Sequence, residues 1–216
     1  MHKLLVLVGC CALATSFVTV QPLDANELPQ AKLLYKIDTT DKVVFLTADD
    51  GSDRPADAAA ELERLQWPIS SFILPSKVGA YASWFSSLGS HNDIGTHSAH
   101  HVALKGLSFE KQKTEICEGE RRLKEKFGST TGYFRPPYGS WDKRTLQAAA
   151  ACGISHVVLW TVSLNGRTIT TWDGKIHSGN IALVHYIGSM AQSIRRFEQQ
   201  LKVQGLTVAR LSDYLK

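Results

Sequence analysis

One stretch of the sequence joins an apolar run to two adjacent aspartates: Val43-Val44-Phe45-Leu46-Thr47-Ala48-Asp49-Asp50-Gly51. The apolar run is short and rich in β-branched and aromatic residues, which predicts a buried strand. Two carboxylates at the end of such a strand repel each other, so their presence there indicates a bound cation or a catalytic role that needs both. The alternative is a plain turn, in which an aspartate caps a helix and Gly51 supplies the bend.

Outward from this stretch, strand-like runs alternate with segments of helical periodicity. Alternation of this kind predicts an α/β domain with a mostly parallel sheet, arranged as a barrel or as a doubly wound sheet. No internal repeat and no second domain is apparent in the sequence. The predicted strands are 43–46, 69–74, 93–95, 133–134, 154–160, 181–184 and 206–209, and the predicted helices are 56–65, 78–88, 108–127, 142–152 and 191–203.

The first 25 residues have the composition of an export signal. Lys3 is followed by an uncharged apolar run over residues 4–20, and small residues lead to a possible cleavage point after Ala25. An uncleaved membrane anchor is the alternative, but a span needs roughly 17–25 apolar residues and this run is at the short end. We therefore expect a secreted, periplasmic or cell-wall-associated protein without stable membrane contact. Residues 26–40 are predicted to be a short lead-in to one domain over residues 41–216.

Composition excludes several classes of protein. The chain is 44% hydrophobic and 20% charged, which is typical of a globular domain. Its net charge of +4 comes without blocks of like charge, so it does not indicate a nucleic-acid partner. We also expect the protein to be a monomer. Cys117 and Cys152 are the cysteines outside the signal segment, and the sequence leaves open whether they pair or stay as free thiols.

Further polar clusters follow other predicted strands, where α/β folds build their sites. His97-Ser98-Ala99-His100-His101 comes after the strand at 93–95. On one helical turn, His97 and His101 would face the same way and share a metal, and an aspartate from the first cluster would complete an open site. His100 would point elsewhere.

Two more clusters lie further along the chain. In Arg135-Pro136-Pro137-Tyr138-Gly139, the prolines hold an arginine and a backbone amide stiffly, although a rigid loop with a surface arginine explains the same residues. Leu183-Val184-His185 places a histidine at the tip of a strand, where a structural role and a catalytic role are equally compatible with it. The chain has neither a glycine-rich phosphate loop nor a G-x-S-x-G elbow.

Taken in order, these clusters resemble the polysaccharide deacetylase family, which is the NodB-homology domain of carbohydrate esterase family four. That family carries T-F-D-D-G, H-[ST]-x-x-H, R-x-P-[YF]-G, an Asp/Trp segment and L-x-H, and four of the five are present between Thr47 and His185. The resemblance covers the chain beyond the signal and implies a distorted (β/α) barrel of about seven strands. It also implies a metal-dependent hydrolase that removes N-acetyl groups from N-acetylglucosamine glycans, such as peptidoglycan or a chitin-like polymer.

The resemblance assigns a role to each motif residue. Asp50, His97 and His101 would hold a divalent metal, usually zinc, with cobalt or nickel as alternatives. The catalytic roles would fall to Asp49 as general base, Arg135 as the group that orients it, the backbone N–H of Tyr138 as oxyanion donor, and His185 as general acid.

The sequence departs from the family in two places. Ala48 replaces the family's aromatic residue, and the fourth motif is lost, since Ser163-Leu164-Asn165-Gly166-Arg167 stands where acids are expected. Arg135 would then need another partner, such as Asp173. An O-acetyl esterase acting on xylan or a modified glycan, and a weakened relative that only binds glycan, are the alternatives. Four tryptophans are candidates for sugar stacking or for the core: Trp84, Trp141, Trp160 and Trp172.

Overall fold

Strand β2 (Val43–Asp50) lies inside the sheet, between β3 (Ile69–Ile73) and β9 (Ile181–His185). Its apolar residues make it a strand that is buried along nearly its whole length, and it continues through Asp50 instead of ending at Leu46. Both neighbours run parallel to it. The carboxyl ends of these three strands therefore meet at one edge, where a site can be built.

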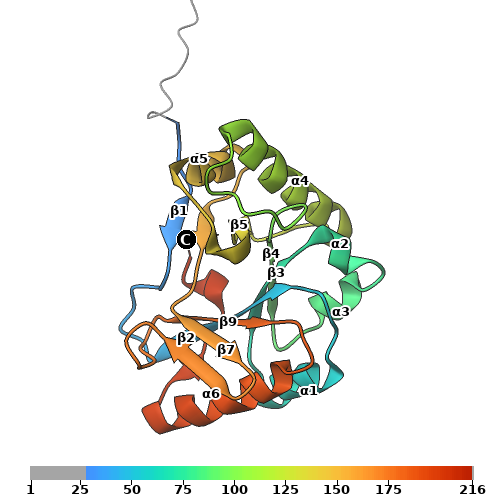
Figure 1. Cartoon of the computed structure of the whole chain (residues 1–216). Coiled ribbons are helices and arrows are strands. Elements are labelled where there is room, and N and C mark those ends of the chain that lie inside the picture. Colours follow the sequence, from blue (N-terminus) through green and yellow to red (C-terminus); the bar gives the residue numbers. More distant parts are fainter. Residues whose placement is uncertain (1–27, 216) are drawn as a thin grey trace, which may run out of the picture.

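The structure, a computed structural model, describes residues 28–215, so the predicted signal segment lies outside the described residues. The described part is an α/β domain with one curled sheet and helices around it (Figure 1). The other strands are β1 (Lys32–Leu34), β4 (Asn92–Thr96), β5 (Tyr133–Phe134), β6 (His156–Val158), β7 (Val162–Asn165), β8 (Thr168–Thr171) and β10 (Thr207–Val208).

The ten strands form one sheet in the order β1-β6-β5-β4-β3-β2-β9-β7-β8, with β10 paired to β2. Every neighbouring pair is parallel except the hairpin of β7 and β8. Each predicted strand is present, whereas β1, β7 and β8 were not predicted. Strand β1 lies inside the segment expected to be a lead-in, so the sheet begins before residue 41.

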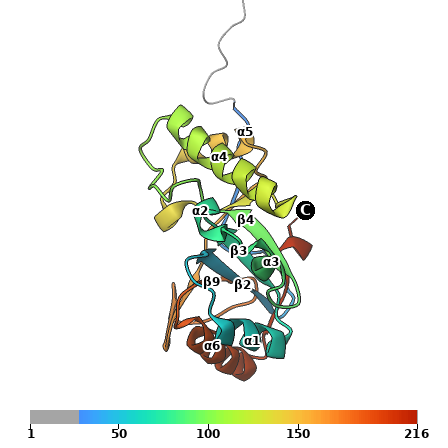
Figure 2. The ribbon, with the colours of Figure 1, turned by 90° about the vertical axis from the view of Figure 1, so that its right-hand side faces the viewer.

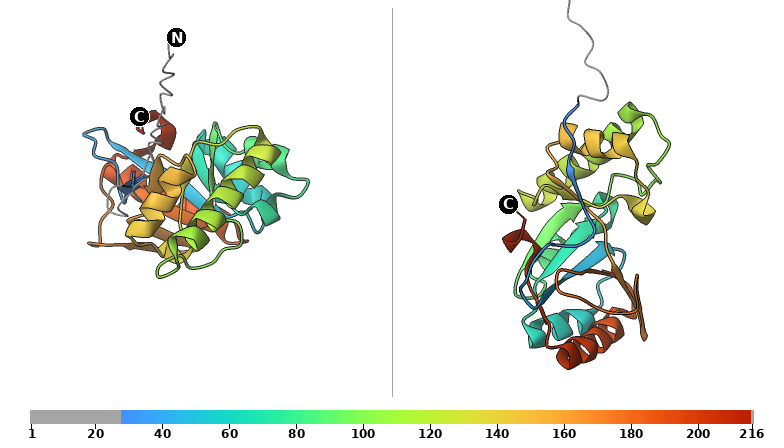
Figure 3. Two further views of the ribbon diagram at one scale, coloured as in Figure 1. Left: turned by 90° about the horizontal axis from the view of Figure 1, so that it is seen from above. Right: turned by 90° about the vertical axis from the view of Figure 1, so that its left-hand side faces the viewer.

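The sheet curls because β6 and β7 are almost one continuous strand. They are separated in sequence by residues 159–161 alone, yet β6 pairs with β1 and β5, whereas β7 pairs with β9. Within the connection, Leu159 donates to the carbonyl of Leu34, and Thr161 donates to that of Ile181. This segment brings the two ends of the sheet together and gives the predicted distorted (β/α) barrel. In the right-hand view of Figure 3, β1 and the residues after it (blue) run across the barrel.

Helices cover the outside of the curled sheet (Figure 2). Helices α4 and α5 pack against each other on one side, and α1 and α6 do so on the other. The helix predicted at 78–88 is instead two short helices, because Gly79 and the two residues after it interrupt it. The helices are α1 (Ala56–Leu65), α2 (Pro75–Val78), α3 (Ala82–Ser86), α4 (Phe109–Phe127), α5 (Lys143–Ala151) and α6 (Met190–Gln204), with 3₁₀ turns η1 (Pro137–Gly139) and η2 (Leu211–Asp213).

A disulfide between Cys117 and Cys152 ties α4 to the end of α5, which settles the pairing that the sequence left open. A capping box at the start of α5 adds a second tie, since Asp142 accepts from the backbone of Arg144 and Thr145 and also from Gln112 on α4. No helix among residues 28–215 is long and apolar enough to cross a membrane.

Alternate residues of β2 line the inside of the barrel. Phe45 is fully buried and packs in an apolar cluster with Phe72, Tyr133 and Ile181. Two and four residues later the same face carries Thr47 and Asp49, because side chains alternate along a strand. The barrel interior therefore changes from apolar to polar toward the carboxyl ends of its strands, where the site residues lie.

Candidate metal and catalytic site

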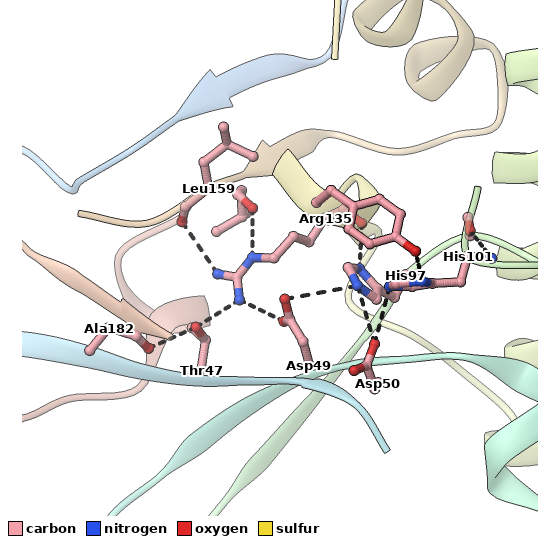
Figure 4. A network of polar contacts seen from close by, with 11 residues as sticks. Thr47, Asp49, Asp50, His97, His101, Arg135, Leu159 and Ala182 are labelled. Carbon is pink, nitrogen blue, oxygen red and sulfur yellow. Dashed lines mark hydrogen bonds and ion pairs between the residues drawn. The ribbon is translucent and has the colours of Figure 1, made fainter. Parts of the chain in front are cut away.

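Predicted site residues converge at the carboxyl ends of β2, β4 and β5 (Figure 4), and His185 ends the neighbouring strand β9. The register of β2 and β9 sets Asp49 beside His185, and the register of β3 and β4 sets Ile73 beside Thr96, the residue before His97. Strand pairing thus brings together residues that are far apart in sequence.

Asp50, His97 and His101 form a cluster whose ligand atoms all lie within 4.8 Å of one another. Oδ1 of Asp50 is 3.3 Å from Nε2 of His101 and 3.6 Å from Nε2 of His97. His97 is buried, while Asp50 and His101 are partly exposed. Three protein ligands with one open side are the arrangement of a catalytic zinc site.

The donor atoms of this cluster fit a divalent metal. Nδ1 of His97 lies 2.7 Å from the carbonyl oxygen of Arg135, so it carries the proton and leaves Nε2 free as a ligand. Burial lowers the pKa of His97 and favours the neutral ring that a metal requires, although Asp49 opposes this shift. Oδ1 of Asp50 is buried and has no hydrogen-bond partner among the described residues, which is costly unless a cation fills the space.

The loop that carries the two histidines is not helical, contrary to the predicted helical turn. It follows β4, and its Ser98 and His101 have positive φ values of 73° and 60°. Asp50 is also in this region, at 74°. Such backbone costs about 1–3 kcal/mol per residue and accumulates at functional sites. The imidazoles meet because the chain reverses between them, with ring centroids 5.0 Å apart.

Helix α4 holds this loop in place through two residues that the sequence did not single out. Glu115 accepts from the backbone of Ala99 and His100 and from Nδ1 of His100, which keeps His100 away from the metal cluster as expected. Gly119 lets the helix approach closely, since a Cβ there would lie 2.6 Å from the carbonyl carbon of Ser98. A small residue on the buried face of an otherwise charged helix is the sequence signal for such an approach.

Asp49 is buried and paired with Arg135, whose Nη1 lies 2.7 Å from its Oδ1. Its other oxygen, Oδ2, faces the metal cluster, 3.9 Å from Nε2 of His97. One carboxylate oxygen is therefore fixed by the arginine, and the second is directed at the open side of the site.

Tyr138 lies beside the metal cluster in a strained conformation, with φ at 60°. Its hydroxyl is 3.1 Å from Nδ1 of His101, and the two rings pack edge to face. No protein group in the described part of the chain accepts a hydrogen bond from its backbone N–H. His185 ends β9 as an exposed residue in register with Asp49, so its side chain lies on the same side of the sheet.

A family model for polysaccharide deacetylases matches residues 36–157, which is more than half of the 216 residues. The chain belongs to the polysaccharide deacetylase family. The matched span contains all of the candidate site residues except His185. An uncharacterized protein of Streptomyces coelicolor is 34% identical over 185 residues, which are 82% of this chain and 74% of that protein.

Two further comparisons are with a named enzyme and with a solved structure. The peptidoglycan-N-acetylglucosamine deacetylase of Bacillus cereus is 23% identical over 205 residues, covering 87% of this chain and 95% of that enzyme. The crystal structure of a carbohydrate esterase family 4 pseudoenzyme from Bacillus anthracis superposes with a TM-score of 0.74 at 21% identity, over 88% of this chain and 71% of that protein. This second likeness shows the fold alone.

This member of the family supports its arginine without the acid of the fourth motif. Besides Asp49, Arg135 donates to Oγ1 of Thr47 at 2.9 Å, to the carbonyl of Val158 at 2.9 Å and to that of Leu159 at 3.3 Å. The guanidinium also packs over the ring of Phe72. Together with Asp49, main-chain carbonyls and a hydroxyl thus provide hydrogen-bond acceptors for a guanidinium that is fully buried.

The suggested substitute acid, Asp173, is wrong. Asp173 is exposed and pairs with His177, 2.9 Å away, because its loop turns back on itself before β9. The residues that replace the fourth motif form the β7–β8 hairpin, whose turn contains Gly166 at a φ of 58°.

Proposed function

We propose that this polysaccharide deacetylase is an exported, metal-dependent hydrolase that removes N-acetyl groups from N-acetylglucosamine-containing glycans. One observation carries the proposal: the Asp50, His97 and His101 cluster lies beside a buried carboxylate, Asp49, that Arg135 holds by one oxygen. Hydrolysis of an unactivated amide requires a metal site with a general base held in position beside it. The activity of the Bacillus cereus relative supports peptidoglycan or a chitin-like polymer as the substrate.

Asp50, His97 and His101 would hold the metal through Oδ1 and the two Nε2 atoms. Two imidazoles and a carboxylate suit zinc, and cobalt or nickel also accept this donor set. When bound, such an ion supplies Lewis acidity, which acidifies water and polarises a carbonyl oxygen.

Asp49 accepts the proton of the attacking water through Oδ2, the oxygen that Arg135 leaves free. Because three acceptors other than Asp49 immobilise Arg135, it fixes the direction in which that oxygen points. Positioning of this kind lowers the barrier, since the base is already oriented before the reaction begins.

Two groups complete the chemistry on the acyl and amine sides. The free N–H of Tyr138 donates to the oxygen that becomes negative as the acetyl carbon turns tetrahedral. His185 delivers a proton to the departing nitrogen, because an amine leaves poorly without one and imidazole titrates near neutral pH. Its exposure at the end of β9 lets it reach a substrate that approaches from solvent.

Export is supported by two features of the chain. Residues 4–20 are apolar and uncharged and follow a basic residue, as in a signal peptide. The disulfide between Cys117 and Cys152 is typical of proteins that fold in an oxidising compartment.

Acetate release from acetylated chitooligosaccharides and from peptidoglycan tests the proposal, with the metal removed and then restored as zinc, cobalt or nickel. We expect release to depend on metal and to fall at least a hundredfold in Asp49→Asn and in His97→Ala. His100→Ala is the matched control, because His100 lies in the same loop but pairs with Glu115 outside the cluster. Activity that survives both site substitutions would exclude the proposed mechanism.

The same acetate-release assay, with acetylxylan added as a substrate, together with a measurement of glycan binding, distinguishes the alternatives. Faster turnover of acetylxylan than of chitooligosaccharide would indicate an O-acetyl esterase, since an alkoxide leaves more easily than an amine. Glycan binding without acetate release under any of the three metals would indicate a weakened relative that has lost catalysis along with its fourth motif.

A further inference from the structure

A hollow of about 630 Å³ lies away from the metal cluster, between the segment that follows β1 and the loop that joins β8 to β9. Its two walls are tied together by the bridge between Lys36 and Asn180. Both walls lie on the side of the molecule that faces the viewer in the right-hand view of Figure 3. None of the catalytic or metal-binding residues lines this hollow.

Two aromatic rings form part of its wall. Trp172 is 70% exposed, which is unusual for the largest apolar side chain, and its ring packs at 5.2 Å from that of Tyr35. The hydroxyl of Tyr35 accepts a hydrogen bond from Nε1 of Trp141 at 3.1 Å. Trp172 is thus held by Tyr35, and Tyr35 is held by Trp141. The exposed indole therefore presents a flat surface in a fixed orientation.

The structure also sorts the other tryptophans. Trp84 is partly buried and packs against the core, edge to face on Phe85 and Tyr186. Trp160 packs near Arg135 at the catalytic site. Trp172 therefore has no core role that would explain its position.

Polar groups of both signs complete the hollow. Lys36 and Lys175 supply donors, and the acceptors are the oxygens of Asp173 and Asn180, which already accept from Lys175 or His177. Thr161 also lines it, and its buried hydroxyl has no hydrogen-bond partner among the described residues. Mixed donors and acceptors around an aromatic face suit a neutral ligand with many hydroxyl groups, whereas a charged ligand would require charges of one sign.

Two short segments connect the hollow to the catalytic residues. Leu159 accepts from Arg135, and Thr161, two residues later, lines the hollow. Tyr138 contacts His101, and Trp141, three residues later, contacts Tyr35. Since an extended residue spans at most about 3.6 Å, each segment bridges only about 7–11 Å.

We propose that this hollow is a second sugar-binding site, which holds units of the glycan chain beyond the one that is deacetylated. The proposal rests on the proposed function for the identity of the glycan. A pyranose ring stacks on Trp172, and the polar groups around it bind the hydroxyls. A long oligosaccharide that binds at the metal cluster also reaches the hollow, whereas a disaccharide that binds there does not.

Calorimetric titration with the N-acetylglucosamine hexamer and dimer tests this, in an Asp49→Asn background that prevents turnover. We expect Trp172→Ala to weaken hexamer binding about tenfold and to leave dimer binding unchanged, because stacking contributes to the long ligand alone. Trp172→Phe is the matched control, since it keeps an aromatic face and should retain most of the affinity. Because Trp172 is mostly exposed, these variants are expected to fold.

The outcomes separate this proposal from the proposed function. Hexamer affinity that is equal in Trp172→Ala and in its parent, or hexamer binding too weak to measure in the parent, would overturn the second site. Acetate release by the enzyme with native Asp49 is measured independently and decides the function. A selective loss of hexamer affinity supports the second site even if no acetate is released.

Discussion

The hydroxyl of Tyr138 lies 3.1 Å from Nδ1 of His101, whose Nε2 faces Asp50. A partner on the far nitrogen fixes the orientation and tautomer of a ligating imidazole, and its loss typically costs 10- to 100-fold in metal affinity. We therefore expect Tyr138→Phe to weaken zinc binding about tenfold, measured by competition with a chromophoric chelator. Trp141→Phe, in the same loop but without contact to a ligand, should bind zinc normally. Equal affinities for wild type and Tyr138→Phe would show that His101 is positioned by its backbone alone.

Gly119 limits the distance between α4 and the loop that carries the histidines. An alanine Cβ would lie 2.6 Å from the carbonyl carbon of Ser98, and that backbone cannot move without shifting the ligands. Although alanine favours a helix over glycine by about 1 kcal/mol, overpacking costs about 1–3 kcal/mol. We expect Gly119→Ala to lower both the free energy of unfolding and the zinc affinity. Lys126→Ala, at an exposed position of the same helix, is the control, and a stabilised Gly119→Ala would contradict the predicted contact.

Thr47 relays support to the base through Arg135. Its hydroxyl accepts from Arg135 and donates to the carbonyl of Ala182 at 2.8 Å. In Thr47→Val, which has the same shape, one buried N–H of the guanidinium loses its acceptor, at a cost of about 1–3 kcal/mol. Deacetylation should fall about tenfold in kcat, with KM little changed, whereas Thr47→Ser should remain close to wild type. A valine variant with full kcat would show that the carbonyls alone suffice.

The disulfide between Cys117 and Cys152 closes a loop with a sequence separation of 35 residues. A cross-link over a loop of this size stabilises a protein by about 2–4 kcal/mol. We expect the double variant Cys117→Ser/Cys152→Ser to lose about that much in urea unfolding. Reductant should destabilise the wild type to the same level and leave the double variant unchanged. A wild-type protein that is indifferent to reductant would argue against this bond in solution.

Asp142 makes the fold sensitive to acid. Partial burial raises its pKa, but hydrogen bonds from Gly106, Gln112, Arg144 and Thr145 outweigh this effect and lower it to about 2. Because the unfolded chain takes up the proton at higher pH than the folded one, the stabilisation is complete above about pH 4 and is lost as the pH falls through 2.

Asp142→Asn keeps a capping side chain but removes the charge. We expect the wild type to lose about 1 kcal/mol more than this variant between pH 5 and pH 2, after allowing for solvent screening. The free energy of unfolding in urea across this range provides the measurement. Parallel pH profiles for the two proteins would assign the acid sensitivity to other carboxylates.

The features that could be predicted from the sequence are those that local patterns encode. Buried strands such as β2 and β9 are continuous apolar runs, and α4 and α5 carry their caps in the sequence. The polar β8 gives no such signal, because it is an exposed hairpin strand that is defined by its partner β7. Asn165-Gly166 is a hairpin signal that was available in the sequence.

At the site, residue types could be predicted but their geometry could not. The spacing of His97 and His101 suggested a helix, whereas positive φ values at Ser98 and His101 bring the rings together. Such values depend on the support of α4, through Glu115 and Gly119, which lie far along the chain. The support of Arg135 could not be predicted either, because it comes largely from main-chain carbonyls, whereas the sequence suggested only acidic side chains as partners.

The carbonyls of Val158 and Leu159 that hold Arg135 belong to the end of β6 and to the connection that leads from it to β7. A carbonyl is present whichever side chain the residue carries, so ordinary substitutions at these two positions leave this support in place. Evolutionary drift through the fourth motif can therefore proceed without releasing the arginine. In this chain the path of the main chain, and not the side chains of the fourth motif, decides whether the arginine is held.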